Sequence, residues 1–299
     1  MPTAPADDWL RRVAAIQRFA SGGQRAPHKP LLLLTYLARV QSGAPRIMAY
    51  SALEQPLIEA LDAFSSTPDA RPHYPFKRLE NDGLWEIAAE RPPLTGAGDL
   101  KLGWLRDHDP GAGIPIEDHE LLLSTPGLID RTVRLLLGWH FPPSLWADIV
   151  DTTGVEHDLD SLIDIGLSGP LNPRRRRDPR FRATVLTAHR AACVVCGYDG
   201  RRRTQPVGLD AAHIRWHTHD GPDDLANGLA MCSLHHVLFD RGMFTYDADQ
   251  QLRVSPRFQA TDAGVLADMH GRRLGPPQQP APDPRHLAWH RSEVFKDTA

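Results

Sequence analysis

Cysteine is scarce in this chain, with three among 299 residues, and the odd number argues against a framework of disulfide bonds. A chain of this length can bury a hydrophobic core without such cross-links. The sequence also lacks an apolar run long enough to cross a membrane, and its start lacks the basic segment and apolar core of a signal peptide. We therefore expect a cytoplasmic protein that has no membrane among its partners.

An excess of positive charge is missing as well. The 34 Lys and Arg residues are outnumbered by 37 Asp and Glu residues, which gives a formal net charge of −3. This balance excludes a general polycation that coats nucleic acid. Contact with nucleic acid must then use local basic runs. Arg174–Arg177 and Arg201–Arg203 are candidates, and simple solvation is the equal alternative for each.

The three cysteines that are present all lie in one short window. Cys193 and Cys196 form a CxxC pair, and Cys232 and His235 form a CxxH pair. Two ligands at this spacing can hold one tetrahedral ion from a tight turn, and a second pair completes the shell. We therefore predict a structural Zn²⁺ site, in preference to three buried cysteines beside an unrelated histidine.

Further polar residues lie between and beside the two pairs. Val207–Ile214 predicts a strand that carries His213, a loop leads from there to Asn227, and Leu234–Asp240 predicts a short helix that carries His236. A strand, loop and helix with His, Asn and His in this order, inside a zinc frame, resembles the HNH nuclease family. That family has a ββα-metal fold, which we expect for this segment.

The resemblance to HNH nucleases implies a role for each of these residues. His213 would be the general base that deprotonates a water molecule. Asn227 would hold the loop and help to orient His213 or the ion. His236 would bind a catalytic divalent metal, Mg²⁺ or Mn²⁺, which stabilises charge on the scissile phosphate.

One position departs from the HNH pattern. Many members have an Asp directly before the first histidine, where it serves as a metal ligand, and this chain has Ala212 there. Asp210 or Asp240 would then supply the carboxylate, or the ion would be held mainly by histidine, water and phosphate. The departure leaves the preferred metal open.

The rest of the chain predicts an α+β protein with a mostly helical N-terminal domain, a small hairpin and the zinc-stabilised C-terminal domain. An Asn-Asp-Gly turn at Asn81–Gly83 predicts the hairpin. We expect a DNA-recognition domain over residues 1–150, a linker over 151–177 that overlaps a Pro- and Gly-containing region at 142–172, and the nuclease domain over 178–299. Apolar periodicity predicts helices over Asp8–Ala20, Pro30–Val40, Tyr50–Phe64, Glu117–Ser124 and Ile129–His140.

Three motifs in the first half carry a second resemblance. They are Ala26–Pro30 ahead of an apolar run, Tyr74–Leu79, and Asn81–Trp85. Together they are similar to the sulfur-binding domain that precedes an HNH nuclease in type IV, McrA-like restriction endonucleases. Those enzymes cut phosphorothioate-modified DNA, so the resemblance implies double-stranded DNA with a backbone phosphorothioate as the partner.

The sulfur-binding resemblance implies a surface with apolar and cationic parts. Sulfur in place of a phosphate oxygen makes one face of the phosphate larger, softer and less hydrated, so an apolar cup can bury it at low cost. We expect Trp85 to lie in the core. The cup would come from Tyr74, Pro75 and Phe76, while the remaining oxygens and neighbouring phosphates would be held by His28, Lys29 and Arg78.

Two alternatives stay open at this stage. The chain would be an HNH endonuclease directed to methylated bases or to a plain sequence if the aromatic cluster at Tyr74–Phe76 stacks on a flipped base. It would be a non-catalytic, zinc-stabilised DNA-binding protein if Ala212 marks a lost metal site. Metal-dependent cleavage separates both enzymes from the binding protein.

Two hydrolyses are needed for a double-strand break, and a C2 homodimer is the commonest way to supply two active sites. Leu135–Leu137 with Trp139, or the proline-rich segment at 275–284, are candidate interfaces. Packing within one subunit is the equal alternative for both.

Overall fold

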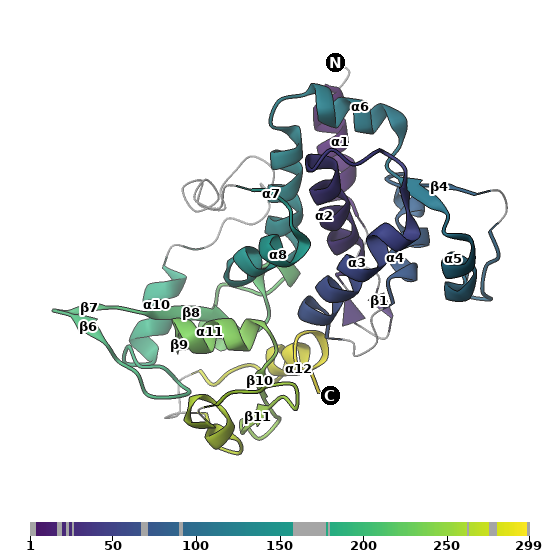
Figure 1. Ribbon diagram of the computed structural model, residues 1–299. Coiled ribbons are helices and arrows are strands. Elements are labelled where there is room, and N and C mark those ends of the chain that lie inside the picture. Colours follow the sequence, from purple (N-terminus) through teal and green to yellow (C-terminus); the bar gives the residue numbers. More distant parts are fainter. Residues whose placement is uncertain are drawn as a thin grey trace. The chain divides into compact units, whose positions relative to one another are not determined.

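The computed structural model describes residues 4–16, 20–21, 24–25, 27–66, 71–89, 92–157, 178, 180–261, 263–274 and 280–297. The chain divides into two compact units, which are described separately. The first comprises Met1–Ser65 and Asp69–Gly166, and the second comprises Ser66–Pro68 and Leu167–Ala299. Figure 1 labels their helices and strands.

The first unit is built around one apolar helix. Helix α2 (His28–Gln41) buries Leu31–Leu34 almost completely, because apolar residues occupy all of its faces. It packs against several of the other helices. Its partners are α3 (Tyr50–Phe64), α4 (His73–Arg78), α7 (Leu128–His140) and α8 (Trp146–Thr153). The unit also contains α1 (Pro5–Ala14), α5 (Leu102–His108) and α6 (Ile116–Ser124).

A small antiparallel sheet lies beside these helices. Its strand order is β3 (Met48–Ala49), β5 (Gly111–Gly113) and β4 (Glu86–Ala88), and Ala112 is the register partner of both Met48 and Ile87. A second, two-stranded sheet pairs β1 (Ala20–Ser21) with β2 (Gln24–Arg25). A Cβ atom at Gly113 would lie 2.0 Å from the carbonyl oxygen of Arg46, so only glycine fits the central strand there.

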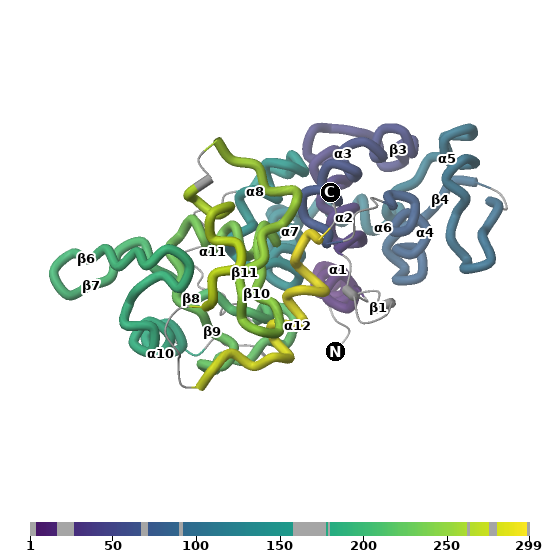
Figure 2. Tube along the Cα trace, turned by 90° about the horizontal axis from the view of Figure 1, so that it is seen from below, coloured from purple at the N-terminus to yellow at the C-terminus, as the bar shows by residue number. Residues whose placement is uncertain are grey.

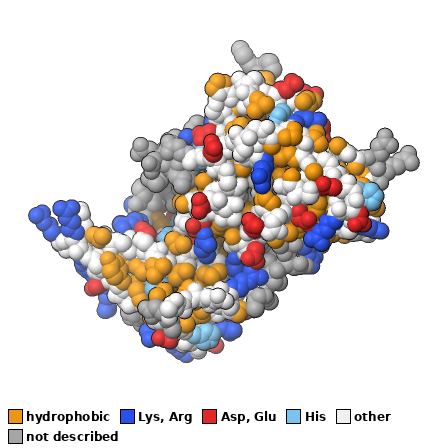
Figure 3. Space-filling model, in the orientation of Figure 1, with side chains coloured by type: hydrophobic (Ala, Val, Ile, Leu, Met, Phe, Trp, Pro, Cys, Tyr) orange, Lys and Arg blue, Asp and Glu red, His pale blue; other side chains and the backbone are white. Residues whose placement is uncertain are grey.

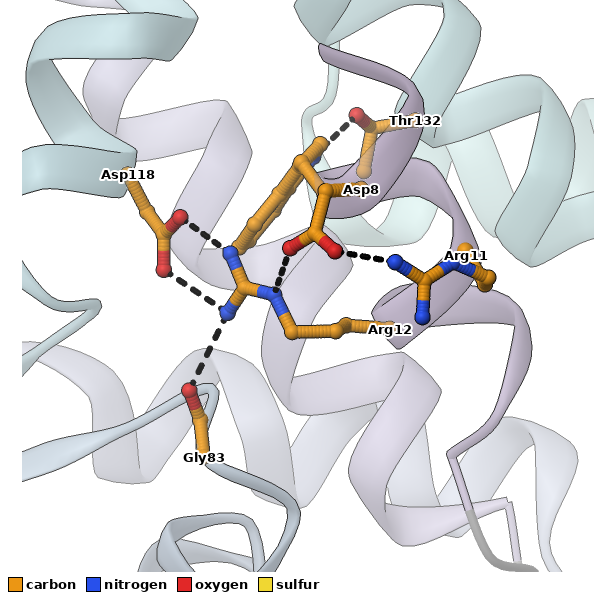
Figure 4. Close-up of polar contacts among 7 residues, drawn as sticks. Asp8, Arg11, Arg12, Gly83, Asp118 and Thr132 are labelled. Atoms are coloured by element: carbon orange, nitrogen blue, oxygen red, sulfur yellow. Dashed lines mark hydrogen bonds and ion pairs between the residues drawn. The ribbon is translucent and has the colours of Figure 1, made fainter. Parts of the chain in front are cut away.

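Arg12 connects three parts of the first unit, as Figure 4 shows. Its guanidinium binds Asp8 on α1 at 3.0 Å, Asp118 on α6 at 3.0 Å and the carbonyl oxygen of Gly83 at 3.3 Å. The hydrogen bonds with Asp118 are the main cause that raises the pKa of Arg12. This partly buried cluster holds the turn at Gly83, which leads directly into Trp85 and β4.

Two predictions in the first unit are wrong. The first helix ends at Ala14, and Ala20 lies in β1 instead of in that helix. No hairpin forms at Asn81–Gly83, because β4 pairs with β5, which lies far along the chain. Gly83 has φ of 69° and ends a 3-10 turn over Glu80–Asp82, and this left-handed geometry suits a helix end as well as a hairpin.

The second unit contains the predicted ββα arrangement. Strands β8 (Leu209–His213) and β9 (Gly228–Cys232) pair antiparallel with His213 opposite Gly228, and α11 (Ser233–Asp240) follows β9 directly. Around them lie α10 (Phe181–Ala188), β6 (Arg201–Arg202), β7 (Gln205–Pro206), β10 (Phe244–Tyr246), β11 (Leu252–Val254) and α12 (Pro284–Glu293). Figure 2 shows the same elements from a second direction.

Most predicted elements are confirmed, and the α+β fold class is confirmed with them. Helices α2, α3, α6 and α7 match their predicted ranges closely. Helix α8 lies inside the region 142–172, so the part of the predicted linker before 154 is helical. Residues 158–177, which include Arg174–Arg177, and residues 275–279 lie outside the described part of the chain. The domain boundaries remain a prediction.

Of the two alternatives for Leu135–Leu137, the structure supports packing within one subunit. All three leucines are buried inside the first unit by its own helices, because they form the apolar face of α7. None of the described helices is both long enough and apolar enough to cross a membrane.

Candidate zinc, nuclease and sulfur-binding sites

The first CxxC pair lies in a tight knuckle ahead of β6. The amide of Gly197 donates to the carbonyl oxygen of Cys193 at 2.9 Å, and the amide of Cys193 donates to Tyr198 at 2.8 Å. Gly197 has φ of 76°, a left-handed conformation that glycine adopts without strain. The turn therefore brings the thiols of Cys193 and Cys196 to the same side of the chain.

The four predicted zinc ligands converge in space. The ligand atoms of Cys193, Cys196, Cys232 and His235 all lie within 4.8 Å of one another. Nδ1 of His235 lies 3.0 Å from Sγ of Cys232, and its Nε2 lies 2.9 Å from the carbonyl oxygen of Val265. This outer contact leaves Nδ1 as the ligand atom, which is the arrangement typical of a zinc-bound histidine. A Cys3His donor set of this size fits Zn²⁺.

His213 lies at the end of β8 and is held on two sides. Its Nε2 lies 2.7 Å from Oδ1 of Asp223, and its ring stacks on Phe181 at 4.1 Å between centroids. A carboxylate only accepts hydrogen bonds, so Nε2 carries the proton and Nδ1 carries the lone pair of the neutral ring. Burial raises the pKa of Asp223, but the hydrogen bonds from His213 and from the amide of Asp178 outweigh it and lower the pKa.

Asn227 closes the loop that follows His213. Its side chain accepts from the amide of Arg215 at 2.8 Å and donates to the carbonyl oxygens of Arg215 and Pro222 at 2.9 and 3.0 Å. Asn227 is fully buried. It therefore fixes the loop backbone and, through it, the position of Asp223 beside His213, but it is not exposed to a substrate.

His236 lies between two carboxylates on α11 and β8. Its Nε2 lies 3.2 Å from Oδ2 of Asp240, and its Nδ1 lies 3.7 Å from Oδ2 of Asp210. The other oxygen of Asp240 accepts from Trp216 at 2.9 Å. Burial opposes a positive charge on His236, but Asp240 and Asp210 outweigh it and raise its pKa to about 9. The surroundings of His236 thus stabilise a cation.

The geometry separates the roles of the two carboxylates. Asp240 is almost fully buried and fully engaged by Trp216 and by Nε2 of His236, so it orients the ring. Asp210 is partly exposed, and its Oδ2 faces Nδ1 of His236. Asp210 and Ala212 alternate with Ala211 on β8, so they share one face of the strand. Asp210 therefore lies on the side from which a carboxylate at position 212 would project.

Tyr74 lies on α4 between two guanidinium groups. The Arg78 guanidinium lies 4.4 Å from the centre of the Tyr74 ring, the Arg71 guanidinium lies 5.3 Å from it, and Arg71 also binds the phenol oxygen at 2.6 Å. Arg78 forms two bonds to the carboxylate of Asp99, at 2.7 and 2.8 Å. A half-buried ring with cations on it provides an apolar face beside positive charge.

His28 and Lys29 begin α2 close to this cluster. Burial, followed by the charges of Arg78, Arg71 and His73, lowers the pKa of His28 to about 4, so its imidazole is neutral near pH 7. Lys29 binds Asp82 at 2.6 Å, and both side chains are largely buried. Lys29 thus already has a carboxylate partner that a phosphate would have to replace.

Phe76 does not line the predicted cup. Its ring is 1% exposed and packs edge-on against Tyr50 and Trp85. Trp85 is 2% exposed and lies in the core as predicted. Pro75 is also buried, so of the three residues predicted to form the cup only Tyr74 has a half-exposed side chain.

Residues 6–158, half of the chain, match the family described as “ScoMcrA-like, DNA sulfur-binding domain”. The chain belongs to this family. Residues 193–247 match the family described as “HNH endonuclease”, and this range contains the zinc ligands, His213, Asn227 and His236. The chain thus joins a DNA sulfur-binding domain to an HNH endonuclease domain, and no curated protein matches it.

Several solved structures are similar to this sulfur-binding and HNH protein. The sulfur-binding domain of ScoMcrA complexed with phosphorothioated DNA is 26% identical, with a TM-score of 0.45 over 54% of this chain and 99% of the other. The Type IV phosphorothioation-dependent restriction endonuclease ScoMcrA is 26% identical, with a TM-score of 0.46 over 60% of this chain and 33% of the other. The chain thus spans about a third of that enzyme's length.

Two contacts in the sulfur-binding and HNH domains were not predicted from the sequence. Asp223 holds His213, and Arg71 holds Tyr74. Asp223 follows a Gly-Pro pair in the loop, a signal for a turn that says nothing about a histidine ten residues earlier. Arg71 precedes Tyr74 by three residues, so the i,i+3 contact of a helix start would have identified it.

Proposed function

We propose that this protein recognises DNA that carries a backbone phosphorothioate and hydrolyses a phosphodiester bond near the modification. The observation that carries the proposal is the union, in one chain, of a sulfur-binding domain and an HNH domain in which the histidine and its supporting carboxylate are both in place. A modification-dependent restriction endonuclease needs these two parts.

His213 supplies the general base. Its neutral ring accepts a proton from water through Nδ1, while Asp223 holds the Nε2 proton and stabilises the imidazolium that forms. Phe181 fixes the plane of the ring, and Asn227 fixes the loop that carries Asp223. These contacts preorganise the base, so little reorientation is needed when the water is deprotonated.

His236 and Asp210 would hold the catalytic divalent ion. Nδ1 of His236 and the Asp210 carboxylate oxygen 3.7 Å from it would act as a donor pair once the ion displaces the Nδ1 proton, and Asp240 orients the ring through Nε2. Mg²⁺ or Mn²⁺ in this position would neutralise charge on the scissile phosphate and the leaving oxygen. Asp210 would thus replace the carboxylate that Ala212 lacks. A zinc ion bound by His235, the residue before His236 on α11, would keep His236 in place.

Loss of the Asp210 carboxylate is expected to weaken this metal site. Asp210→Asn should lower the Mn²⁺ affinity of the zinc-loaded protein by at least about tenfold, because the amide removes one anionic ligand. Calorimetric titration measures the affinity without requiring cleavage. Asp249→Asn, an exposed change in the turn between β10 and β11, is the matched control. Equal Mn²⁺ affinity in both variants would reject Asp210 as a ligand.

The sulfur atom would lie against the exposed face of Tyr74. The ring covers the sulfur with little loss of hydration, while Arg71 and Arg78 lie close enough to bind the remaining phosphate oxygens. His28 is neutral and can donate a hydrogen bond without attracting every phosphate equally. Pro75 and Phe76 are buried and would not touch the sulfur, and Lys29 contributes only if DNA displaces Asp82.

Cleavage of two duplexes that differ by one backbone sulfur tests the proposed function directly. With Mg²⁺ or Mn²⁺, we expect cutting of the sulfur-bearing duplex alone. Equal cutting of both would remove sulfur recognition and leave an HNH endonuclease with another target. Binding without cutting across a full metal titration would instead favour a non-catalytic DNA-binding protein.

Tyr74→Ala is expected to reduce the preference for sulfur over oxygen. If the Tyr74 ring buries roughly 40 Å² of the sulfur surface, about 25 cal/mol per Å² corresponds to a roughly fivefold higher affinity for the sulfur-bearing duplex. The variant should lose this preference. The ratio of affinities for the two duplexes, measured by fluorescence anisotropy, checks this. Tyr74→Phe keeps the ring and should keep the ratio, and an unchanged ratio in Tyr74→Ala would exclude the ring from the sulfur site.

A pair of active sites would complete the reaction on both strands. We propose a homodimer as the simplest source of that pair. Sedimentation of the protein with and without a sulfur-bearing duplex distinguishes a constitutive dimer from one that forms on DNA.

A further inference from the structure

A hairpin rich in arginine extends from the nuclease unit. Strand β6 (Arg201–Arg202) pairs with β7 (Gln205–Pro206), and Arg203 lies in the turn between them with φ of 58°. The side chains of Arg201, Arg202 and Arg203 are all exposed. Figure 3 shows Lys and Arg side chains gathered at the tip where Figure 1 places β6 and β7, and Figure 2 shows the hairpin extending beyond β8 and β9.

The hairpin lies outside the hydrophobic core of its unit. None of the residues 201–206 belongs to the buried cluster around β8, β9 and α11. The hairpin base is nonetheless ordered, because Tyr198 lies against Gly200 and Gly208, where a Cβ atom would come within 2.1 and 3.5 Å of the phenol oxygen. Because the β6–β7 hairpin is held at its base and contributes no side chain to the core, its exposed side chains are available to bind a partner.

The basic surface continues from the hairpin to the metal site. The guanidinium of Arg201 donates to the carbonyl oxygen of Arg190 at 3.1 Å, and that of Arg182 donates to the carbonyl oxygen of Leu209 at 2.7 Å. Leu209 directly precedes Asp210. Residues 182–209 hold five arginines and a single carboxylate, Asp199, although the whole chain has a net charge of −3.

We infer that the surface formed by Arg182, Arg190 and Arg201–Arg203 binds phosphates of the DNA duplex beside the scissile bond. Guanidinium groups form charge-assisted bonds with phosphate oxygens, and such contacts position a duplex without selecting its sequence. The inference rests on the proposed nuclease function of the neighbouring site. It places the hairpin on the DNA backbone next to the bond that is cut, because only two residues lie between Val207, at the base of the hairpin, and Asp210.

The salt dependence of binding tests this surface. Each phosphate contact contributes about 0.9 to the slope of log affinity against log salt concentration. Arg202→Ala with Arg203→Ala should therefore lower the slope by roughly 1.8, so that wild-type affinity falls about tenfold more than that of the variant between 50 and 200 mM salt. The full chain is measured on a plain duplex in a His213→Ala background, which keeps the DNA intact.

Two further variants make the result specific. Arg272→Ala with Arg273→Ala removes the same charge from exposed positions of the same unit and should leave the slope nearly unchanged. Arg202→Lys with Arg203→Lys keeps the charge and should restore most of the slope. A hairpin variant that matches the Arg272 and Arg273 control would overturn the inference.

The outcomes also separate this inference from the proposed function. Phosphate contacts are independent of sulfur, so the change in slope should be equal for plain and sulfur-bearing duplexes. If the wild type fails to prefer the sulfur-bearing duplex but the hairpin variant loses slope, sulfur recognition fails and the hairpin surface stands. If the wild type cuts only the sulfur-bearing duplex and the slope does not change, the proposed function stands and the hairpin surface fails.

Discussion

His213→Ala is expected to lower the rate of DNA cleavage by about 10²–10⁴-fold while the affinity for DNA stays within twofold. The imidazole is held in place to accept a proton from water, because Asp223 lies 2.7 Å from its Nε2 and fixes the tautomer, and Phe181 fixes its plane. Alanine removes the base but leaves Arg71, Tyr74 and Arg78 in the sulfur-binding domain unchanged. Single-turnover cleavage of a sulfur-bearing duplex, with binding measured in parallel, checks both halves of the expectation.

The matched control for His213→Ala is His270→Ala. His270 is an exposed histidine in the same unit and lies outside the HNH range of 193–247. The His270→Ala variant should cleave DNA at the wild-type rate. Cleavage by His213→Ala at the wild-type rate would reject its assignment as the base. A loss of cleavage that is accompanied by an equal loss of DNA affinity would point instead to a damaged fold.

The sequence predicted the cluster of three cysteines and His235 because the relevant distances are local. A CxxC or CxxH pair fixes two ligands within one turn of chain, and Gly197 allows the turn. The alternation along β8 likewise places Asp210 and Ala212 on one face without knowledge of the tertiary structure. Asp223 was beyond such reasoning, because its contact with His213 depends on the path of a loop that Asn227 closes from inside.

Two errors in the first unit each have a physical cause. Tyr74, Pro75 and Phe76 were treated as one surface cluster, but α4 is helical, and residues two apart on a helix point about 200° apart. Phe76 therefore enters the core while Tyr74 faces outward. The turn at Asn81–Gly83 was taken as a hairpin because glycine with positive φ serves both hairpins and helix ends. The pairing of β4 with the distant strand β5 shows that the turn ends a helix and does not form a hairpin.

Cys196→Ser is expected to remove zinc from the protein and to destabilise the nuclease unit severely. Structural zinc sites contribute apparent binding free energies of roughly 10–16 kcal/mol, which exceeds the stability of a typical domain. Cys196 is exposed, so the substitution removes little packing and the effect reports on the metal. Zinc content by mass spectrometry and the melting transition of the nuclease unit by calorimetry measure the two expectations.

The same change should abolish cleavage through its effect on α11. His235 and His236 are neighbours on this helix, so an ion bound by His235, Cys193 and Cys196 would also keep His236 between Asp210 and Asp240. A strong chelator should produce the same loss in the wild type and add nothing to Cys196→Ser. A variant that keeps one zinc per chain and melts like the wild type would show that Cys196 is not a ligand. If zinc is lost but cleavage persists, the two histidines are positioned independently, because the core packing of Phe239 then suffices to hold α11.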